Sequence, residues 1–550
     1  MQTVAREQEW KEIHERALLN ETFVEVSLEI TDPDALADAE AEDNGGIYTS
    51  QSAPVTKTGD RTTHPYCTLE QNLWCLDGSR RVIPESNFED DTYTSDVLSD
   101  ETCVFSSKRP TISICFDETH NKLIPGVTIT WSKTYNEYAD TFEIIVYKEG
   151  DIIITKEVTG NKSIETMVLF DFIDYDRVEV IIKKWCLPYR RARVEAIILG
   201  LSKVYGKGDL FSYSHKQHVD PISTSLPKSE ITFSVDNVNR EYDIQNPNSL
   251  AKYLTKNQEV KVRYGLKMDD GSIEWVNGGV FYLSEWYAKQ NGMTADFTAR
   301  DLFGFMSDIV LDSDILWEPV SGVRRISYVV EELLKRANLP QGSSSNPRWV
   351  ISESLRYVRC DAPVDTDTVA NNLQLLANAG KCVLYQDRDG IIHIEPLNNE
   401  DSDYEISNFN SYTKSESSLS TPVKQVRVKK YAYYYGPAPD YELLSRIDKE
   451  IHYPADEDIP NGVYGETIIV DNPYVSVDEE ALGIAEWMYN YLNNRMNIES
   501  SWRADVRMDA LDIVKNRNDY GTNRVRMTDI EYTYNGAFRA TGKGRVIENG

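Results

Sequence analysis

Two histidines with a nearby carboxylate are the first residues in this 550-residue chain whose spacing could support chemistry. His215 and His218 lie in the polar segment SYSHKQHVD, and Asp220 ends it. Imidazole nitrogens and carboxylate oxygens bind zinc, so these residues could form part of a metal site. No third ligand of fixed geometry is evident from the sequence, and hydrogen-bonded or solvent-facing loop histidines explain the segment better. We therefore predict no metal and no cofactor.

Paired carboxylates are the second candidates, because a glycosidase holds two carboxyl groups about 5–10 Å apart across a cleft. The runs at 89–91 and 269–270 supply such pairs, but 89 acidic residues make adjacency expected by chance. The DRDG segment (387–390) begins like a calcium loop and lacks the acid that such a loop needs at its twelfth position. The chain has no GxSxG, HExxH or Walker motif. We predict that it is not an enzyme.

An excess of acidic over basic residues, 89 against 58, gives the chain a formal net charge of −31. Binding to phosphate groups needs clustered Lys and Arg, so we predict no sequence-specific nucleic-acid partner. Two interpretations of the charge stay open. It either keeps the protein in solution or provides a non-adhesive surface along a channel that DNA traverses.

The cysteines and the chain start indicate where the protein is made. Seven cysteines form no CxxC pair, which argues against a zinc framework or a redox motif. The N-terminal sequence lacks the basic and then apolar pattern of a signal peptide, and no window approaches the roughly 18–20 apolar residues of a membrane span. We expect synthesis in a cytoplasm, where thiols stay reduced, and no membrane span.

The first 201 residues read mainly as strands. FVEVSLEI (23–30) alternates apolar and polar residues as a half-buried strand does, and an amphipathic helix is predicted before it over 4–19. The acidic, small-residue stretch 31–62 predicts a linker. Short strand-like runs separated by Asp, Asn, Gly and Pro then predict a β-sandwich over 66–201. Its three tryptophans, Trp74, Trp131 and Trp185, sit in apolar strand patterns and are predicted to be core.

The remaining residues alternate between strand and helix patterns. Helices are predicted over 325–339 and 477–496, and in the first part of 365–397, where Gly380 would cap the helix. Hairpins are predicted to turn at Asp389-Gly390 and at Asn535-Gly536.

The segment 275–306, WVNGGVFYLSEWYAKQNGMTADFTARDLFGFM, carries the most specific pattern in the chain. An apolar and aromatic run is followed by Asn291-Gly292, which predicts a hairpin turn because both central positions of a type I′ turn need φ > 0. TADFTARD then alternates before LFGFM takes helical spacing. This order of a GVFY segment, an Asn-Gly turn and a T-A-x-D segment ending in F-M resembles the hub, or tail-tip, proteins of bacteriophage tails and related injection machines.

The resemblance runs over residues 23–30, resumes near Val204 and continues almost to the C-terminus, with YNGAF (534–538) among the matching segments. It implies a homotrimer whose paired β-barrel domains close the tail tube. The chain ends at Gly550 without the peptidase, lysozyme or fibre appended in some relatives, so we expect no wall-degrading role.

Residues 66–201 resemble a discoidin-like (galactose-binding-like) jelly roll inserted into the hub. The matching segments are LDGS (76–79), GVTITW (126–131) and RVEAIILG (193–200). Jelly rolls of this kind often present loop aromatic and polar residues to a sugar. The loops TYNEYAD and LPYRRAR would then supply saccharide-facing residues, namely Tyr135, Asn136, Tyr138, Tyr189, Arg190 and Arg191. Alternatively, LPYRRAR packs within the domain and its arginines pair with neighbouring acids.

The predicted fold class is mainly β with minor α, a multidomain α+β chain with hub β-barrel domains and an inserted jelly-roll β-sandwich. The predicted domains are an N-terminal helix and first hub strand (1–30), an acidic linker (31–65), the jelly roll (66–201), hub β-domain I (202–310), an α+β segment (311–400), and hub β-domain II (401–550) with the helix 477–496.

The sequence therefore predicts a structural virion protein, a baseplate hub at the distal end of a phage tail that opens for DNA ejection. Its expected partners are two further copies of itself, tail-tube proteins, the tape measure protein and peripheral baseplate or fibre proteins. The first alternative is an adsorption protein that binds host-surface glycan through the jelly roll. The second is an enzyme that cuts wall or capsule polymers.

Overall fold

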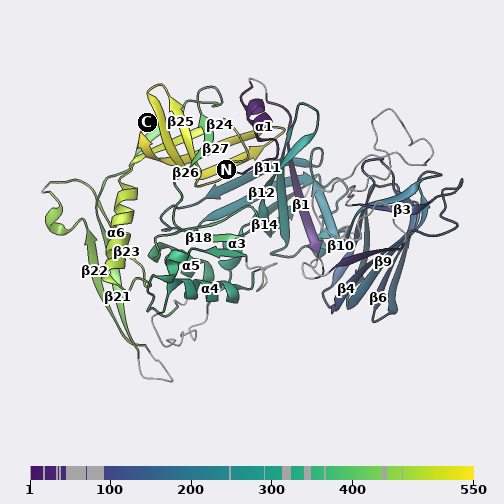
Figure 1. The fold of residues 1–550 in the computed structure, drawn as a ribbon, viewed down its shortest axis with the longest axis horizontal. Helices are drawn as coiled ribbons and strands as arrows, with labels where there is room; N and C mark the ends of the chain where they lie inside the picture. The colour runs from purple at the N-terminus through teal and green to yellow at the C-terminus, as the bar shows by residue number, and fades with distance from the viewer. Residues whose placement is uncertain are drawn as a thin grey trace, which may run out of the picture. The chain divides into compact units, whose positions relative to one another are not determined.

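The computed structural model describes residues 2–16, 19–31, 35, 39–44, 70, 92–246, 249–289, 292–311, 324–339, 348–364, 367–435, 443–460 and 462–549. The fold is mainly β and multidomain, as predicted (Figure 1). It divides into two compact units, which we call the flanking unit (Met1–Val26 with Tyr205–Gly550) and the inserted unit (Ser27–Val204). The chain passes between them in strands β1 (Thr22–Thr31) and β10 (Arg191–Tyr205).

The inserted unit is built from two antiparallel sheets. One has the order β2-β4-β9-β6-β7, and the other places β10 beside β3 and β5, with β8 next to β5. The strands are β2 (Glu40–Asn44), β3 (Tyr93–Leu98), β4 (Thr111–His120), β5 (Ile124–Trp131), β6 (Ala139–Lys148), β7 (Asp151–Val158), β8 (Glu165–Phe172) and β9 (Tyr175–Trp185). Ile144 of the first sheet and Val127 of the second belong to the same buried cluster, so the sheets face each other across one core.

Period-2 alternation explains these sheets. Along β6, Phe142, Ile144 and Val146 are fully buried while the residues between them are half-buried, as expected of a strand with one face on a core. Trp131 and Trp185 are core as predicted, and their ring centroids lie 6.0 Å apart.

The first β-domain of the flanking unit has the strand order β11-β12-β15-β14-β13-β1. Its strands are β11 (Leu210–His218), β12 (Lys228–Asp236), β13 (Glu259–Lys267), β14 (Ile273–Ala288) and β15 (Thr294–Arg300), with η1 (Leu250–Tyr253) before β13. The segment 275–306 folds as predicted, with β14, β15 and then α3 (Leu302–Met306). Gly279 has φ +129°, at a register shift in the β13–β14 pair, where a Cβ would lie 2.8 Å from the Phe281 ring.

A small α+β layer follows. It contains α4 (Ile326–Ala337), η2 (Glu353–Arg356), α5 (Val369–Ala379), and the three-stranded sheet of β16 (Trp349–Ile351), β18 (Ile392–Glu395) and β17 (Val383–Gln386). The predicted helices and the hairpin that turns at Asp389-Gly390 are present. The helix end at Gly380 differs in detail, because Gly380 has φ −84° and Lys381 takes the left-handed conformation with φ +54°.

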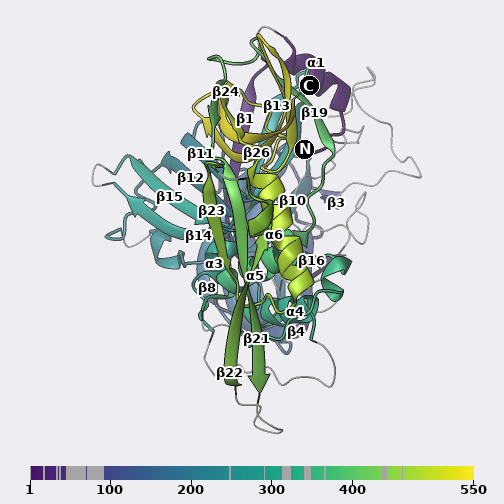
Figure 2. The same ribbon diagram turned by 90° about the vertical axis from the view of Figure 1, so that its left-hand side faces the viewer.

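The second β-domain continues the sheet of the first, since β11 pairs with β26. The strands of this continued sheet are β19 (Asp401–Ile406), β20 (Glu416–Leu419), β24 (Met496–Arg503), β25 (Ile513–Asn518), β26 (Gly521–Tyr534) and β27 (Phe538–Asn549). A separate sheet has the order β22 (Leu443–Tyr453), β21 (Val423–Tyr435) and β23 (Glu466–Asp471). The helical elements are η3 (Asp456–Asp458) and α6 (Asp478–Leu492). Figure 2 shows α6 lying along β21–β23.

Three predicted elements differ from the structure. The helix predicted over 477–496 ends at Leu492, because the Asn493 side chain exchanges hydrogen bonds with the backbone of Val423 and β24 starts at Met496. The helix predicted over 4–19 is the shorter α1 (Glu7–His14). The polar segment that contains the two histidines is strand β11 and not a loop.

Several predictions fall wholly or partly outside the described residues. These are most of the linker 31–62, the LDGS segment (76–79), Trp74, the carboxylate run 89–91 and Asn291 of the predicted Asn-Gly turn. Within 31–62, β2 pairs with β4 through its backbone, which an acidic sequence permits. In the described part of the chain we find no helix long and apolar enough to cross a membrane.

Candidate functional site

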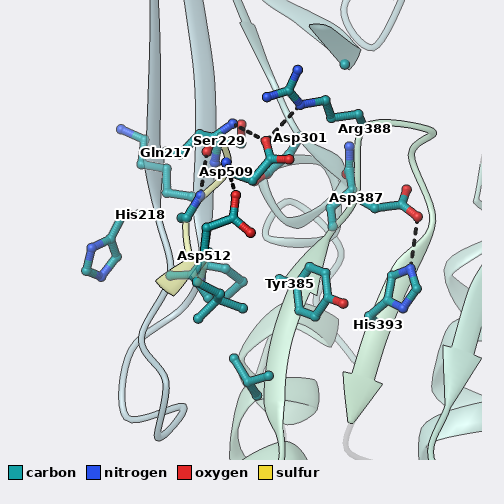
Figure 3. Close-up of a pocket in the computed structure, with 18 of the residues that line it drawn as sticks. Gln217, His218, Ser229, Asp301, Tyr385, Asp387, Arg388, His393, Asp509 and Asp512 are labelled. Carbon is teal, nitrogen blue, oxygen red and sulfur yellow. Dashed lines mark hydrogen bonds and ion pairs between the residues drawn. The ribbon is translucent and has the colours of Figure 1, made fainter. Parts of the chain in front are cut away.

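A cavity of about 350 Å³ lies where three parts of the flanking unit meet, and we call it the junction cavity (Figure 3). The first β-domain contributes residues of β11, β12 and β14, the α+β layer contributes the β17–β18 hairpin, and the second β-domain contributes 509–512. Its polar and charged lining includes His215, Gln217, His218, Ser229, Asp301, Tyr385, Asp387, Arg388, His393, Asp509 and Asp512.

Arg388 and Asp509 form the central ion pair of the cavity. Arg388 Nε donates to Asp509 Oδ1 over 2.7 Å, and the two remaining guanidinium nitrogens donate to the backbone carbonyls of Asn277 and Met508, each over 2.8 Å. The guanidinium therefore touches all three parts of the unit. Burial alone would raise the pKa of Asp509, but the Arg388 charge and the hydrogen bonds from Gln2 and Arg388 together outweigh it and hold this pKa below its ordinary value.

Two further carboxyl groups in the cavity have pKa values above their ordinary value. Asp301 caps α3 by accepting hydrogen bonds from the backbone N–H of Gly304 (2.9 Å) and also of Ser229 (2.6 Å), and burial raises its pKa to about 7. Burial and the neighbouring Asp509 charge raise the pKa of Asp512. The cavity thus holds carboxyl groups whose pKa values are shifted in opposite directions.

The two histidines that were weighed as part of a metal site do not converge. His215 is buried between the hydroxyls of Tyr264 (2.9 Å) and Ser229 (2.8 Å), and burial lowers its pKa to about 3. His218 bonds to Asp529 (2.7 Å) instead. Three residues apart on a strand, the two side chains leave opposite faces. No group of three His, Cys, Asp or Glu in the described residues is arranged to hold a metal ion.

The β17–β18 hairpin completes the wall. His393 Nε2 pairs with Asp387 over 2.9 Å, and its ring stacks on Tyr385 with centroids 4.9 Å apart. Tyr385 donates to Glu395 over 2.5 Å. These titratable groups form hydrogen bonds and ion pairs with neighbouring protein groups, so the arrangement is suited to holding the three parts together.

Five of the six residues predicted to face a saccharide lie in two adjoining loops of the inserted unit, and the sixth, Arg191, is the first residue of β10. A hydrogen bond from the Cys186 N–H to the Tyr138 carbonyl joins the two regions (3.0 Å). In the first loop, Tyr138 packs against the core, and the Tyr135 ring lies 4.4 Å from the Arg193 guanidinium carbon. Asn136 is exposed and has φ +55°.

In the second loop the arginines bind protein groups. Arg190 is buried and its Nε lies 2.9 Å from Glu137, and Arg191 donates to the carbonyls of Ser95 (2.9 Å) and Asp96 (2.8 Å). Tyr189 is 41% exposed. Of the six predicted residues, Asn136 and Tyr189 therefore present the most open side chains.

No protein-family model matches the sequence, and no curated protein matches it. Solved structures do. The chain is similar to the 43 kDa tail protein of prophage MuSo2 from Shewanella oneidensis, with 12% identity, 62% of this chain and 95% of that chain covered, and a TM-score of 0.41. It is similar to the tail protein from Neisseria meningitidis MC58, with 10% identity, 63% of this chain and 94% of that chain covered, and a TM-score of 0.43. It is also similar to prophage tail protein gp18 from Listeria monocytogenes EGD-e, with 11% identity, 64% of this chain and 93% of that chain covered, and a TM-score of 0.39. Its structural neighbours are phage tail and baseplate proteins.

The junction cavity was not predicted from the sequence. Arg388 stood in a segment read only as a hairpin turn, and Asp509 carried no local signal. Asp301 was detectable, because an Asp immediately before the helical pattern LFGFM is a typical N-cap.

Proposed function

We propose that this chain is a structural protein of a phage virion, a homotrimeric baseplate hub that closes the distal end of the tail tube and opens for DNA ejection. The observation that carries the proposal is the organisation of the flanking unit. Residues 1–26 and 205–550 form one compact unit, although the 178 residues 27–204 lie between them in the sequence. This is the arrangement expected if a separate domain is inserted after the first strand of a hub.

Two further features support a mechanical role. The junction cavity joins its three walls through the Arg388–Asp509 ion pair and hydrogen bonds, which suits a scaffold that transmits load. The formal charge of −31 suits a protein beside a DNA channel, since like charges keep DNA from adhering. The proposed partners are tail-tube, tape measure and peripheral baseplate or fibre proteins, and the proposal gives the chain no catalytic role.

The mass of the purified protein, measured by light scattering over a range of concentrations, tests the homotrimer. The expected value is near three times 62.9 kDa. Immunogold labelling of virions with an antibody against the chain tests the location. Label at the distal tail tip supports the hub, and label elsewhere on the particle contradicts it.

A second proposal concerns the inserted unit, which we propose binds host-surface saccharide. It is supported by the adjoining position of the two predicted loops and by the exposed side chains of Asn136 and Tyr189. A glycan array probed with the full chain tests it. Tyr189→Ala should remove the signal, and Tyr520→Ala, at a tyrosine that is 99% exposed in the flanking unit, should not. An array without signal for the unaltered chain rejects the proposal.

A further inference from the structure

Helix α1 lies between two parts of the flanking unit that are far apart in sequence. On one side is the segment 503–509, which follows β24. On the other is the turn between β13 and β14, residues 268–272. The helix therefore connects the two β-domains.

The contact with 503–509 is buried and dense. Trp10 and Ile13 have no exposed surface, and Trp10 Nε1 donates to Asp505 over 3.2 Å. Arg507 is 1% exposed and donates both to Asp505 (2.6 Å) and to Glu7 (2.7 Å). The buried Asp505–Arg507 pair lies within 503–509 itself. Releasing α1 would take the hydrogen-bond partners Trp10 and Glu7 away from this pair and expose the apolar side chains of Trp10 and Ile13 to water, so this contact is expected to hold.

The contact between α1 and the turn 268–272 is formed by exposed ion pairs. Arg16 donates two hydrogen bonds to Asp269 (2.7 and 2.8 Å), and Arg6 donates to Asp270 (2.9 Å). The four side chains are 35–57% exposed. Exposed ion pairs contribute little to stability and are screened by salt. Hydrogen bonding to Arg16 lowers the pKa of Asp269 to about 2, so the pair stays ionised near neutral pH.

The chain leads directly from this weak contact toward the inserted unit. Residues 15–21 join α1 to β1, and a connection of this length spans at most about 25 Å. On its way, the Asn20 side chain donates to the Lys267 carbonyl (2.9 Å), and the Lys267 N–H donates to the Glu21 carbonyl (2.9 Å). The inserted unit begins at Ser27. A displacement of β1 therefore reaches β13, its neighbour in the sheet, which leads into the turn 268–272, and it also pulls on the C-terminal end of α1.

We propose that α1 is a clamp whose release point is the pair of exposed ion pairs Arg16–Asp269 and Arg6–Asp270. The helix stays seated on 503–509, while movement of the inserted unit on adsorption frees the turn 268–272 and lets the β13–β14 hairpin move away from α1, with the β11–β26 pairing intact. This inference rests on the proposed hub function and names its regulation.

Hydrogen exchange of the purified full chain tests the clamp without any virion. The variants are Arg16→Asp, Asp269→Arg and the double exchange of the two charges. Each single variant should raise exchange at 268–272 about tenfold while 503–509 stays protected, and the double variant should return it to within about twofold of the unaltered chain. Unchanged exchange in the single variants overturns the proposal. Equal opening of 503–509 and the turn also overturns it, because the helix would then leave as a whole.

Virions that carry the same variants test the regulation. An immunoblot first establishes whether the chain is in the particle, and its absence rejects the proposed function while the hydrogen-exchange result still judges the clamp. Where the chain is present, the single variants should eject DNA spontaneously about tenfold faster, and the double variant should restore the original rate, as expected of a charge pair that acts as a unit. Equal ejection rates in all four particles overturn the regulatory role.

Discussion

Arg388 and Asp509 are 121 residues apart in the sequence and form an ion pair of 2.7 Å inside the junction cavity. Arg388 is 5% exposed, and its guanidinium also bonds to the first and second β-domains through two backbone carbonyls. One side chain thus ties together three segments that come from different regions of the chain.

Replacing one partner of this pair should destabilise the protein strongly. Arg388→Met leaves the Asp509 carboxylate, whose side chain is 24% exposed, without its counter-charge, and we expect a loss of about 3 kcal/mol in the free energy of unfolding. Urea denaturation followed by tryptophan fluorescence measures it. Arg356→Met, at an arginine whose side chain is 70% exposed, is the matched control and should change the free energy little.

The double variant Arg388→Met with Asp509→Leu distinguishes the cost of leaving one charge without a partner from the cost of losing the other hydrogen bonds of Arg388. It removes both charges, so much of the stability lost in Arg388→Met should return. A double variant as unstable as the single one would show that the hydrogen bonds to the Asn277 and Met508 carbonyls, and not the ion pair, hold the junction.

Asp301 should make the stability depend on pH. Burial raises its pKa to about 7 in the folded chain, whereas an unfolded Asp titrates near pKa 3.9. Between these values the folded state holds the proton that the unfolded state has lost, so stability falls as pH rises from about 4 to 7, by up to about 4 kcal/mol. Above about pH 7 the fall is complete.

The measurement is urea denaturation at several pH values for the unaltered chain and for Asp301→Asn. Because the amide does not titrate, the difference in stability between the two proteins should decrease as pH rises through this window. The variant also loses part of the cap of α3, which lowers its stability by about 1 kcal/mol at every pH. A pH-independent difference would contradict the raised pKa.

The sequence predicted elements wherever local patterns determine the backbone. Asp389-Gly390 set the turn of the β17–β18 hairpin, because Gly390 takes φ +76°. The segment 275–306 was predicted as strand, strand and helix because alternation and turn chemistry agree there. The β-sandwich followed from short alternating strands.

Such local patterns did not predict contacts between residues that are distant in sequence. Nothing near Arg388 in the sequence selects Asp509 as its partner, and the histidines of β11 were read as loop residues because their strand is polar. His215 is buried all the same, since Tyr264 of β13 and Ser229 of β12 satisfy its ring nitrogens. Local composition does not report partners supplied by residues distant in sequence.

Gly380 should resist substitution although its backbone is ordinary. A Cβ at this position would lie 2.2 Å from the Leu355 side chain, which is fully buried and has little room to move. We expect Gly380→Ala to cost about 1–3 kcal/mol through overpacking. Gly206→Ala, where the nearest atom lies 3.5 Å away, is the control. Thermal unfolding measures both variants, and equal melting temperatures would refute the overpacking argument.

His218 and His215 should titrate in different ranges although they share a strand. The hydrogen bond to Asp529 raises the pKa of His218, while burial lowers that of His215 to about 3. Because the folded pKa of His218 lies above its unfolded value, its contribution to stability is complete below about pH 6.5 and is lost as pH rises through the folded pKa. NMR titration of histidine-labelled protein measures both groups. Asp529→Asn should lower the pKa of His218 toward its ordinary value and leave His215 neutral throughout the neutral range, whereas an unchanged His218 titration would assign its shift to another neighbour.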